Sequence, residues 1–328
     1  MSSVAPAAPA ALGADTMVIR ASGVVKSWGT TLALAGADVV VGPGVTGLLG
    51  ANGSGKTTLF GLLLGLHRPD KGTIAVLGLD PTKAGPDVRA RVGYSPEHHS
   101  LPPDVKAVDF VRHVAEMHGL PRREATGRAS DVLWQVGLGE ERVRPLGTMS
   151  TGQRQRVKLA QAIVHDPVLV LLDEPTEGLD PVQRDDMLAL IRRVGHDFGI
   201  HVVLSSHVLD EVERVADAAV ILHAGRVVSS GALSDLQATS TGGVVVEVAG
   251  DGAALVDAVA ARGVPVQVEG ARIYVTGGPE VFDLVRDELA RLELPVRRLE
   301  PRRRSLEEVF LSAGLVGGQA RSPEGSHG

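Results

Sequence analysis

The sequence has no cysteine among its 328 residues, which excludes disulfide bonds, thiolate catalysis and metal sites with cysteine ligands. Aromatic residues make up only 3% of the chain, although 44% of it is hydrophobic. The cores must therefore be built from valine, leucine, isoleucine and alanine. Acidic residues outnumber basic ones and give a net charge of -6, whereas proteins that coat nucleic acid are usually basic. We therefore expect no nucleic-acid partner.

Long apolar runs are also missing. The longest candidate, Val168 to Leu172, is far shorter than the ~20 residues of a membrane-spanning helix, and two acidic residues follow it. Residues 1–16 are rich in alanine and proline without a basic stretch, so we expect a disordered leader and no secretory signal. Residues 315–328 are rich in glycine and serine and predict a disordered tail.

The pattern of apolar residues predicts two domains. In residues 17–238, an antiparallel β region leads into α/β alternation, and residues 100–165 change to helical spacing. This indicates an α/β domain with a helical insertion. A Thr/Ser/Gly-rich linker precedes residues 244–314, where the expected order β-α-β-β-α-β is typical of a small α+β ferredoxin-like accessory domain.

The segment from Gly50 to Thr58 matches G-x-x-x-x-G-K-[ST], between a buried strand and an apolar helix. Its glycines let successive backbone N–H groups point at a polyphosphate, Lys56 reaches the β- and γ-phosphates, and Thr57 can ligate Mg²⁺. A glycine-rich turn with an exposed lysine is the alternative, but strand and helix supply the context that the motif requires. The predicted ATP-binding residues of this loop are Gly50, Asn52, Gly53, Ser54, Gly55, Lys56, Thr57 and Thr58.

Two adjacent acids, Asp173 and Glu174, follow the apolar strand that ends at Leu172. Ligands of open α/β sheets bind at the carboxyl ends of the strands. One carboxylate can hold Mg²⁺, directly or through water, and the other can polarise the water that attacks the γ-phosphate. An acidic surface turn is the alternative, which the nearby phosphate loop disfavours.

Four further segments stand in a recognisable order: Gly93 to Glu97, Met149 to Gln153, Gly178 to Pro181 and Ser205 to His207. They resemble the Q-loop, signature motif, D-loop and switch histidine of the ATP-binding cassette (ABC) ATPases, a P-loop NTPase family with a RecA-like core. The resemblance covers about residues 17–232. It implies a head-to-tail dimer that holds two ATP molecules, each between one P-loop and the opposing signature motif.

The resemblance assigns roles residue by residue. His207 would bond the γ-phosphate, although an isolated histidine at a strand end is more often structural. Trp28 would stack on adenine, with a core-filling role as the alternative. Lys56, Glu174 and His207 are then the catalytic residues. The residues implied at the signature motif and the D-loop are Ser150, Thr151, Gly152, Gln153 and Asp180.

Three positions depart from the family pattern. Thr151 stands where the signature usually has glycine, which is tolerable if its φ stays negative. Glu97 stands where glutamine is usual, and its carboxylate could accept from water or ligate Mg²⁺ but could not donate. Trp28 replaces the commoner tyrosine. The basic residues Arg154, Arg156 and Lys158, after the signature, could simply form a solvated face.

The segment Ser305 to Leu311 resembles the end of cassettes that pair with ABC-2 type permeases, unless it merely caps the small domain. The sequence thus predicts an ATP-hydrolysing motor subunit of an ABC transporter, more often an exporter. A second ATPase subunit, most simply an identical one, and an integral membrane permease would hold it at the cytoplasmic face of the membrane. The alternatives are a non-transport ABC ATPase of translation or DNA repair, and a regulatory nucleotide-binding module without turnover.

Overall fold

The computed structural model describes residues 17–98, 101–238, 243–278, 280–302 and 306–307. The chain divides into two compact units, with the boundary between Gly231 and Ala232. The expected leader and tail lie outside the described residues, as does most of the segment from Ser305 to Leu311. None of the helices in the described ranges combines the length and hydropathy that crossing a bilayer requires.

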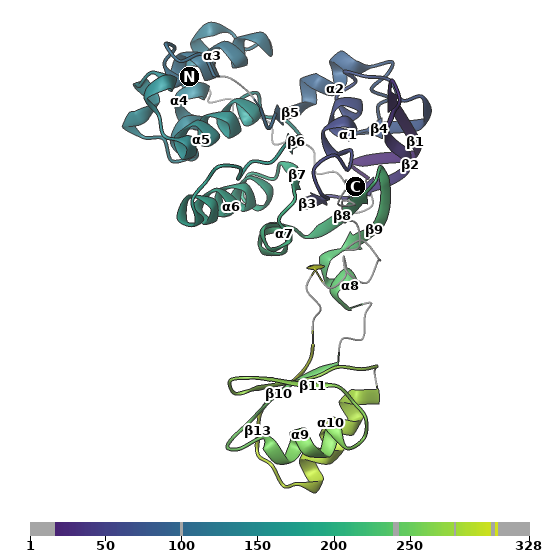
Figure 1. The fold of residues 1–328 in the computed structure, drawn as a ribbon. Coiled ribbons are helices and arrows are strands. Elements are labelled where there is room, and N and C mark those ends of the chain that lie inside the picture. The colour runs from purple at the N-terminus through teal and green to yellow at the C-terminus, as the bar shows by residue number, and fades with distance from the viewer. Residues whose placement is uncertain (1–16, 99–100, 239–242, 279, 303–305, 308–328) are drawn as a thin grey trace, which may run out of the picture. The chain divides into compact units, whose positions relative to one another are not determined.

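A six-stranded sheet in the order β5-β6-β7-β3-β8-β9 forms the centre of the first unit (Figure 1). Every residue of β3 and β6 is buried, which explains their continuous apolar runs, because strands of a parallel sheet are covered on both faces. Strands β5, β6, β7, β3 and β8 run parallel, so their carboxyl ends share one edge. The strands are β3 (Val45–Leu49), β5 (Val92–Ser95), β6 (Leu169–Leu172), β7 (His201–Ser206), β8 (Ala218–His223) and β9 (Arg226–Ala232).

The predicted antiparallel region is confirmed as a three-stranded sheet in the order β2-β1-β4. Strand β1 (Ile19–Trp28) turns tightly into β2 (Thr31–Val41), and Trp28 pairs with Thr31 at the turn. The far edge of β1 pairs with β4 (Lys71–Val76). This hairpin places Trp28 beside the helix that follows the phosphate loop.

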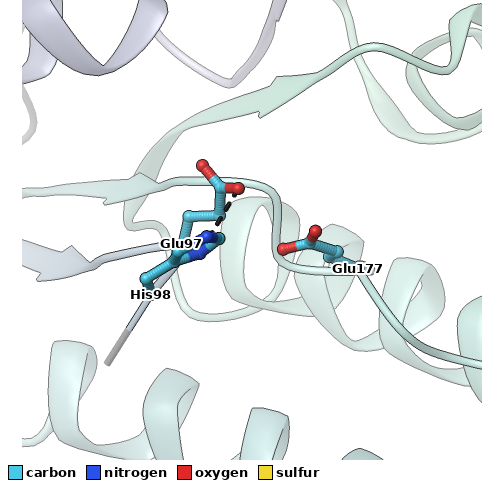
Figure 2. Close-up of side chains that lie close together, drawn as sticks. All are labelled: Glu97, His98 and Glu177. Atoms are coloured by element: carbon cyan, nitrogen blue, oxygen red, sulfur yellow. Dashed lines mark ion pairs between the residues drawn. The ribbon is translucent and has the colours of Figure 1, made fainter. Parts of the chain in front are cut away.

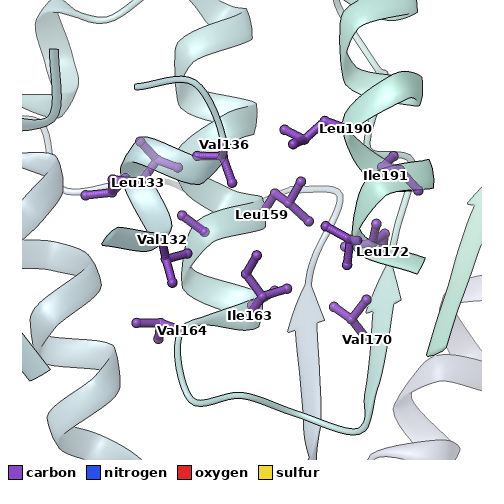
Figure 3. Close-up of a cluster of buried hydrophobic side chains, with 14 of the residues drawn as sticks. Val132, Leu133, Val136, Leu159, Ile163, Val164, Val170, Leu172, Leu190 and Ile191 are labelled. Atoms are coloured by element: carbon purple, nitrogen blue, oxygen red, sulfur yellow. The ribbon is translucent and has the colours of Figure 1, made fainter. Parts of the chain in front are cut away.

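The predicted helical insertion is also confirmed. Its helices share one buried cluster with β6 and with α6, so the insertion packs directly on the parallel sheet (Figure 3). Leu159 and Ile163 of α5 lie in this cluster together with Leu172 of β6. The helices of the first unit are α1 (Lys56–Leu63), α2 (Gly85–Arg91), α3 (Ala107–Met117), α4 (Arg122–Gln135), α5 (Thr151–Ile163), α6 (Pro181–His196) and α7 (Leu209–Val215).

The second unit contains a four-stranded antiparallel sheet in the order β11-β12-β10-β13. With two helices between its strands, this is the ferredoxin-like arrangement that the sequence predicts. Valines of β10 and leucines of the helices fill its own core. Its elements are α8 (Leu233–Ala238), β10 (Val244–Val248), α9 (Ala253–Ala260), β11 (Val266–Glu269), β12 (Arg272–Val275), α10 (Glu280–Arg291) and β13 (Val296–Pro301).

Two histidine rings stack inside the first unit. The centroids of His118 and His165 lie 3.7 Å apart, with 12° between the ring planes. Burial, and after it the neighbouring His118, lowers the pKa of His165 from 6.5 to about 4. The ring of His165 is therefore neutral in the folded protein at pH values where the unfolded chain is already protonated.

We expect this pair to weaken the fold in mild acid. The unfolded chain binds a proton at His165 near pH 6.5 and the folded chain only near pH 4, so the free energy of unfolding falls as the pH falls through this window. His165→Phe keeps a ring in the stack but cannot titrate. It should therefore reduce the loss of unfolding free energy across this pH window by up to about 3 kcal/mol. Denaturant titrations across the window measure this, and parallel curves for the two proteins would contradict the expectation.

Candidate active site

The phosphate loop connects β3 to α1, as the motif predicts. Gly55 has a φ of 110°, and a Cβ at this position would lie 2.6 Å from the Ala33 carbonyl oxygen, so only glycine fits. Gly53 also has a positive φ of 80°, and Asn52 is exposed on the loop. Within the described residues, the buried Ser54 Oγ has no hydrogen-bond partner, as expected of a donor that faces a phosphate.

Lys56 is almost fully buried, and its ammonium points back into the loop. Its Nζ donates to the Gly50 carbonyl oxygen at 2.7 Å and lies 3.2 Å from Glu174 Oε1. The carbonyl takes the directed hydrogen bond, while the contact with Oε1 is an ion pair without hydrogen-bond geometry. Lys56 therefore neutralises the buried Glu174, and the alternative of an exposed lysine is wrong.

Asp173 lies at the end of β6 with both carboxylate oxygens engaged. Thr57 Oγ1 donates to Oδ2 at 3.0 Å, and Ser205 Oγ donates to Oδ1 at 2.6 Å. The side chain of Asp173 is buried, so the surface-turn alternative is wrong for it. A threonine hydroxyl and a carboxylate at this separation are hard oxygen donors of the kind that Mg²⁺ prefers.

Glu174 contacts the other catalytic candidates. His207 Nδ1 lies 2.9 Å from Glu174 Oε2, and the Glu174 backbone N–H donates to Ser205 Oγ at 2.9 Å. Its φ of 46° is a left-handed conformation that is strained for a residue with a side chain. The His207 side chain is 49% exposed, so it lies at the surface of the site beside the buried Glu174.

The signature segment begins α5 through a reciprocal cap. Ser150 Oγ accepts from the Gln153 N–H at 3.2 Å, and Gln153 Oε1 accepts from the Ser150 N–H at 3.1 Å. Thr151 is the first residue of the helix and is not among the residues with positive φ, so its Cβ is tolerated. Gly152 is buried, and a Cβ there would lie 2.8 Å from Gln183 Oε1.

The signature segment is not joined to the phosphate loop of its own chain. In the described residues, no hydrogen bond or ion pair connects Ser150 to Gln153 with the residues from Gly50 to Thr58. Asp180 caps α6, where its Oδ1 accepts from the Gln183 N–H at 2.8 Å. The structure therefore assembles the P-loop, Asp173, Glu174 and His207, and leaves the signature residues apart from them.

Lys158 of α5 does not lie on a solvated face, contrary to that alternative. It is 5% exposed, and its Nζ donates to the Glu97 carbonyl oxygen at 2.8 Å. Burial lowers its pKa, and the acidic residues around it partly offset this effect. Arg154 and Arg156 are only partly exposed. The signature helix is thus tied to the Q-loop by a buried cation.

Glu97 lies beside His98 and Glu177 (Figure 2), and its Oε1 is 3.4 Å from His98 Nδ1. Burial raises the pKa of Glu97, His98 lowers it, and the acids Glu177, Asp173 and Glu174 raise it further. One ligand atom from each of Glu97, His98 and Glu177 lies within 4.8 Å of the others. The departure from glutamine thus adds a carboxylate to an already acidic region.

Trp28 is 45% exposed, so its core-filling alternative is wrong. Its Nε1 donates to Thr58 Oγ1 at 3.3 Å, which fixes the ring at the start of α1. Lys26 Nζ lies 4.8 Å from the ring centroid, and His67 packs against the ring edge-on. An exposed indole beside the phosphate loop provides a surface on which a purine can stack.

Sequence reasoning missed the residues that hold this cluster in place. Ser205 bridges Asp173 and the Glu174 backbone, and Glu211 accepts hydrogen bonds from Thr176 and Ser206. The sequence pattern included Ser205 and Ser206 only as neighbours of His207 and gave them no role of their own. Glu211 carried no signal, since an acid in the first turn of a helix is ordinarily a solvated residue.

Residues 39–177 match the family described as ABC transporter. The daunorubicin/doxorubicin resistance ATP-binding protein DrrA of Streptomyces peucetius is 33% identical over 308 residues, covering 90% of this chain and 92% of that protein. The linearmycin resistance ATP-binding protein LnrL of Bacillus subtilis is 31% identical, covering 70% of this chain and 74% of that protein.

Solved structures agree on the fold. The structure of cbiO1 from Clostridium perfringens, part of the ABC transporter complex cbiONQ, superimposes with a TM-score of 0.62 at 26% identity. It covers 68% of this chain and 91% of that chain. The ADP conformation of another ATP-binding cassette has a TM-score of 0.59 at 22% identity, covering 66% of this chain and 91% of that chain. The chain therefore belongs to the ABC transporter ATP-binding proteins, and it is an ABC-type ATPase that acts as an ATP-driven transport motor.

Proposed function

We propose that Glu174, His207 and Lys56 carry out the hydrolysis of ATP. Glu174 accepts a proton from the attacking water, His207 contacts the γ-phosphate, and Lys56 neutralises the transferring phosphoryl group. The observation that carries this proposal is the position of one carboxylate, 3.2 Å from the Lys56 ammonium and 2.9 Å from the His207 ring. A base, a cation and a phosphate-sensing imidazole then converge at the end of β6.

ATP binds along the loop from Gly50 to Thr58, with its adenine on Trp28. Thr57 and Asp173 would hold Mg²⁺, and Glu97 would approach the ion directly or through water. When bound, this ion would neutralise charge on the β- and γ-phosphates. The 3.0 Å contact between Thr57 Oγ1 and Asp173 Oδ2 supports this pair as ligands.

Two copies of the chain form the working unit. Ser150 and Gly152, at the beginning of α5, would meet the γ-phosphate of the second copy, because a helix N-terminus favours an anion. Thr151 and Gln153 would flank that contact, and Asp180 of the D-loop would face it. The separation of the signature from its own phosphate loop supports this arrangement. A solved cassette of the same fold, with a TM-score of 0.59 at 23% identity, is a dimer bound to ADP and Pi.

The motor drives export through a separate permease of the ABC-2 type at the cytoplasmic face of the membrane. Support comes from the names of the relatives, which describe resistance to daunorubicin, doxorubicin and linearmycin. The match to DrrA spans 90% of this chain, so it extends beyond the cassette into the second unit. Roles in translation or DNA repair are not favoured by any of these observations.

We expect the native protein to co-purify with a membrane protein from detergent-solubilised membranes. A permease must convert the motion of two cassettes into transport, so it should remain bound to them. Affinity purification followed by mass spectrometry tests this, with the same chain expressed alone as the control. A protein that stays monomeric with ATP and brings down no membrane protein would refute the transport complex, though not the ATPase.

A further inference from the structure

One buried carboxylate of the first unit has no part in the proposed chemistry. Glu211, in the first turn of α7, is only 3% exposed. Its Oε2 accepts hydrogen bonds from Thr176 Oγ1 and from Ser206 Oγ, each at 2.8 Å. Its Oε1 lies 3.3 Å from Arg184 Nε. A buried carboxylate is costly unless its oxygens are satisfied, and here both oxygens have partners from other elements.

The two hydroxyl donors come from the segments that present the catalytic residues. Thr176 follows Glu174 after a single proline, and Ser206 directly precedes His207. Ser206 Oγ also accepts from the Val208 N–H at 3.0 Å, so the backbone on both sides of His207 is held. The carboxylate therefore connects the two segments whose side chains meet at 2.9 Å in the site.

The third partner belongs to the helix after the D-loop. Arg184 lies on α6, and its backbone N–H donates to the Asp180 carbonyl oxygen at 2.8 Å. Its guanidinium forms an ion pair with the buried Glu211. Glu211 thus links three parts of the chain through one side chain: the segment from Glu174 to Thr176, the segment from Ser206 to His207, and helix α6.

We infer that Glu211 is a positioning residue for hydrolysis. It fixes the distance between Glu174 and His207 through the Thr176 and Ser206 hydroxyls, without touching the nucleotide. This inference rests on the proposed roles of Glu174 and His207. Misplacement of a catalytic group by about 1 Å is enough to cost about 100-fold in rate, so a remote residue of this kind affects turnover strongly.

The first test is Glu211→Ala, which leaves the Thr176 and Ser206 hydroxyls without their acceptor and Arg184 without its ion-pair partner. We expect kcat to fall by about 10- to 100-fold while KM for ATP changes little, because only the arrangement of reacting groups is altered. Thr176→Val removes one hydroxyl at nearly constant volume and should lower kcat by a smaller factor. Combined with Glu211→Ala, it should add almost nothing, since both changes break the same contact.

Rescue separates positioning from simple packing. Glu211→Gln retains an oxygen that can accept from both hydroxyls, so it should recover much of the kcat lost in Glu211→Ala. The matched control is Glu288→Ala, which removes an equally buried acid, 2% exposed, that pairs with Arg262 and Arg291 in the second unit. This control should lower the thermal midpoint and leave kcat unchanged.

The outcomes are distinguishable. A wild-type kcat in Glu211→Ala with a lowered thermal midpoint would overturn the inference, and so would a rise in KM that accounts for the whole loss of kcat/KM. If Glu211→Ala fails to fold, Thr176→Val still provides the kcat and KM readouts, and its loss of kcat should exceed that of Glu211→Gln. Glu174→Gln, assayed in parallel, tests the proposed base by itself. Undiminished turnover there would defeat the proposed mechanism whatever the Glu211 variants do.

Discussion

Glu174→Gln is expected to bind ATP and to lose nearly all turnover. The amide has the size of the carboxylate but cannot accept the proton of the attacking water, and general-base catalysis contributes about 10²- to 10⁴-fold. The substitution also removes the negative charge that lies 3.2 Å from Lys56 Nζ, so the ammonium becomes free to face the phosphates. ATP binding should therefore be retained or tightened while hydrolysis nearly stops.

Three measurements check this expectation. Steady-state phosphate release should fall, equilibrium binding of ATP should persist, and gel filtration with ATP should show a stable dimer because opening follows hydrolysis. Glu124→Gln, an exposed acid on α4, is a control that should behave as wild type. Hydrolysis at the wild-type rate in the Glu174 variant would exclude this residue as the base.

Lys56→Ala is expected to weaken ATP binding by about 30-fold or more and to abolish turnover. Removing one partner of a buried charge pair costs about 2–5 kcal/mol, and here the phosphate charge would lose its main protein cation. Nucleotide titration by calorimetry or fluorescence measures the change directly. Binding that is unaltered would be incompatible with the phosphate-loop assignment.

The same substitution removes the cation beside Glu174, so a loss of stability must be separated from a loss of affinity. A buried carboxylate without its partner is destabilising. The double variant Lys56→Met/Glu174→Gln removes both charges together, and its thermal midpoint should lie above that of Lys56→Ala. Its affinity for ATP should nevertheless stay low, because the phosphates still lack the ammonium.

Strong periodicity made most of the fold predictable from sequence. The fully buried run of β6 and the glycine-rich loop before α1 each have a local signature, and the ferredoxin-like order of the second unit follows from alternation and helical spacing. The short helix α2 and the strand β9 were not predicted. β9 reads R-V-V-S-S-G-A and is mostly exposed, so backbone pairing with β8 at the sheet edge, and not a buried apolar pattern, makes it a strand.

The site was predictable as a set of residues but not as a set of contacts. Motifs identified Lys56, Glu174 and His207 separately. Nothing in the sequence indicates that they form one chain of contacts, because the fold alone brings three distant segments to the same sheet edge. The solvated-face alternative for Lys158 is wrong for a similar reason, because its helix buries the side that meets the Glu97 carbonyl.

The backbone at Glu174, with its φ of 46°, holds a strained conformation at the residue that the proposed chemistry needs. Glycine there would relax the left-handed backbone, but it would also leave the buried Lys56 ammonium without its partner and remove the proposed base. Engineering a more robust motor from this chain requires position 174 to be held constant, with stabilising changes confined to parts of the molecule that carry no such strain.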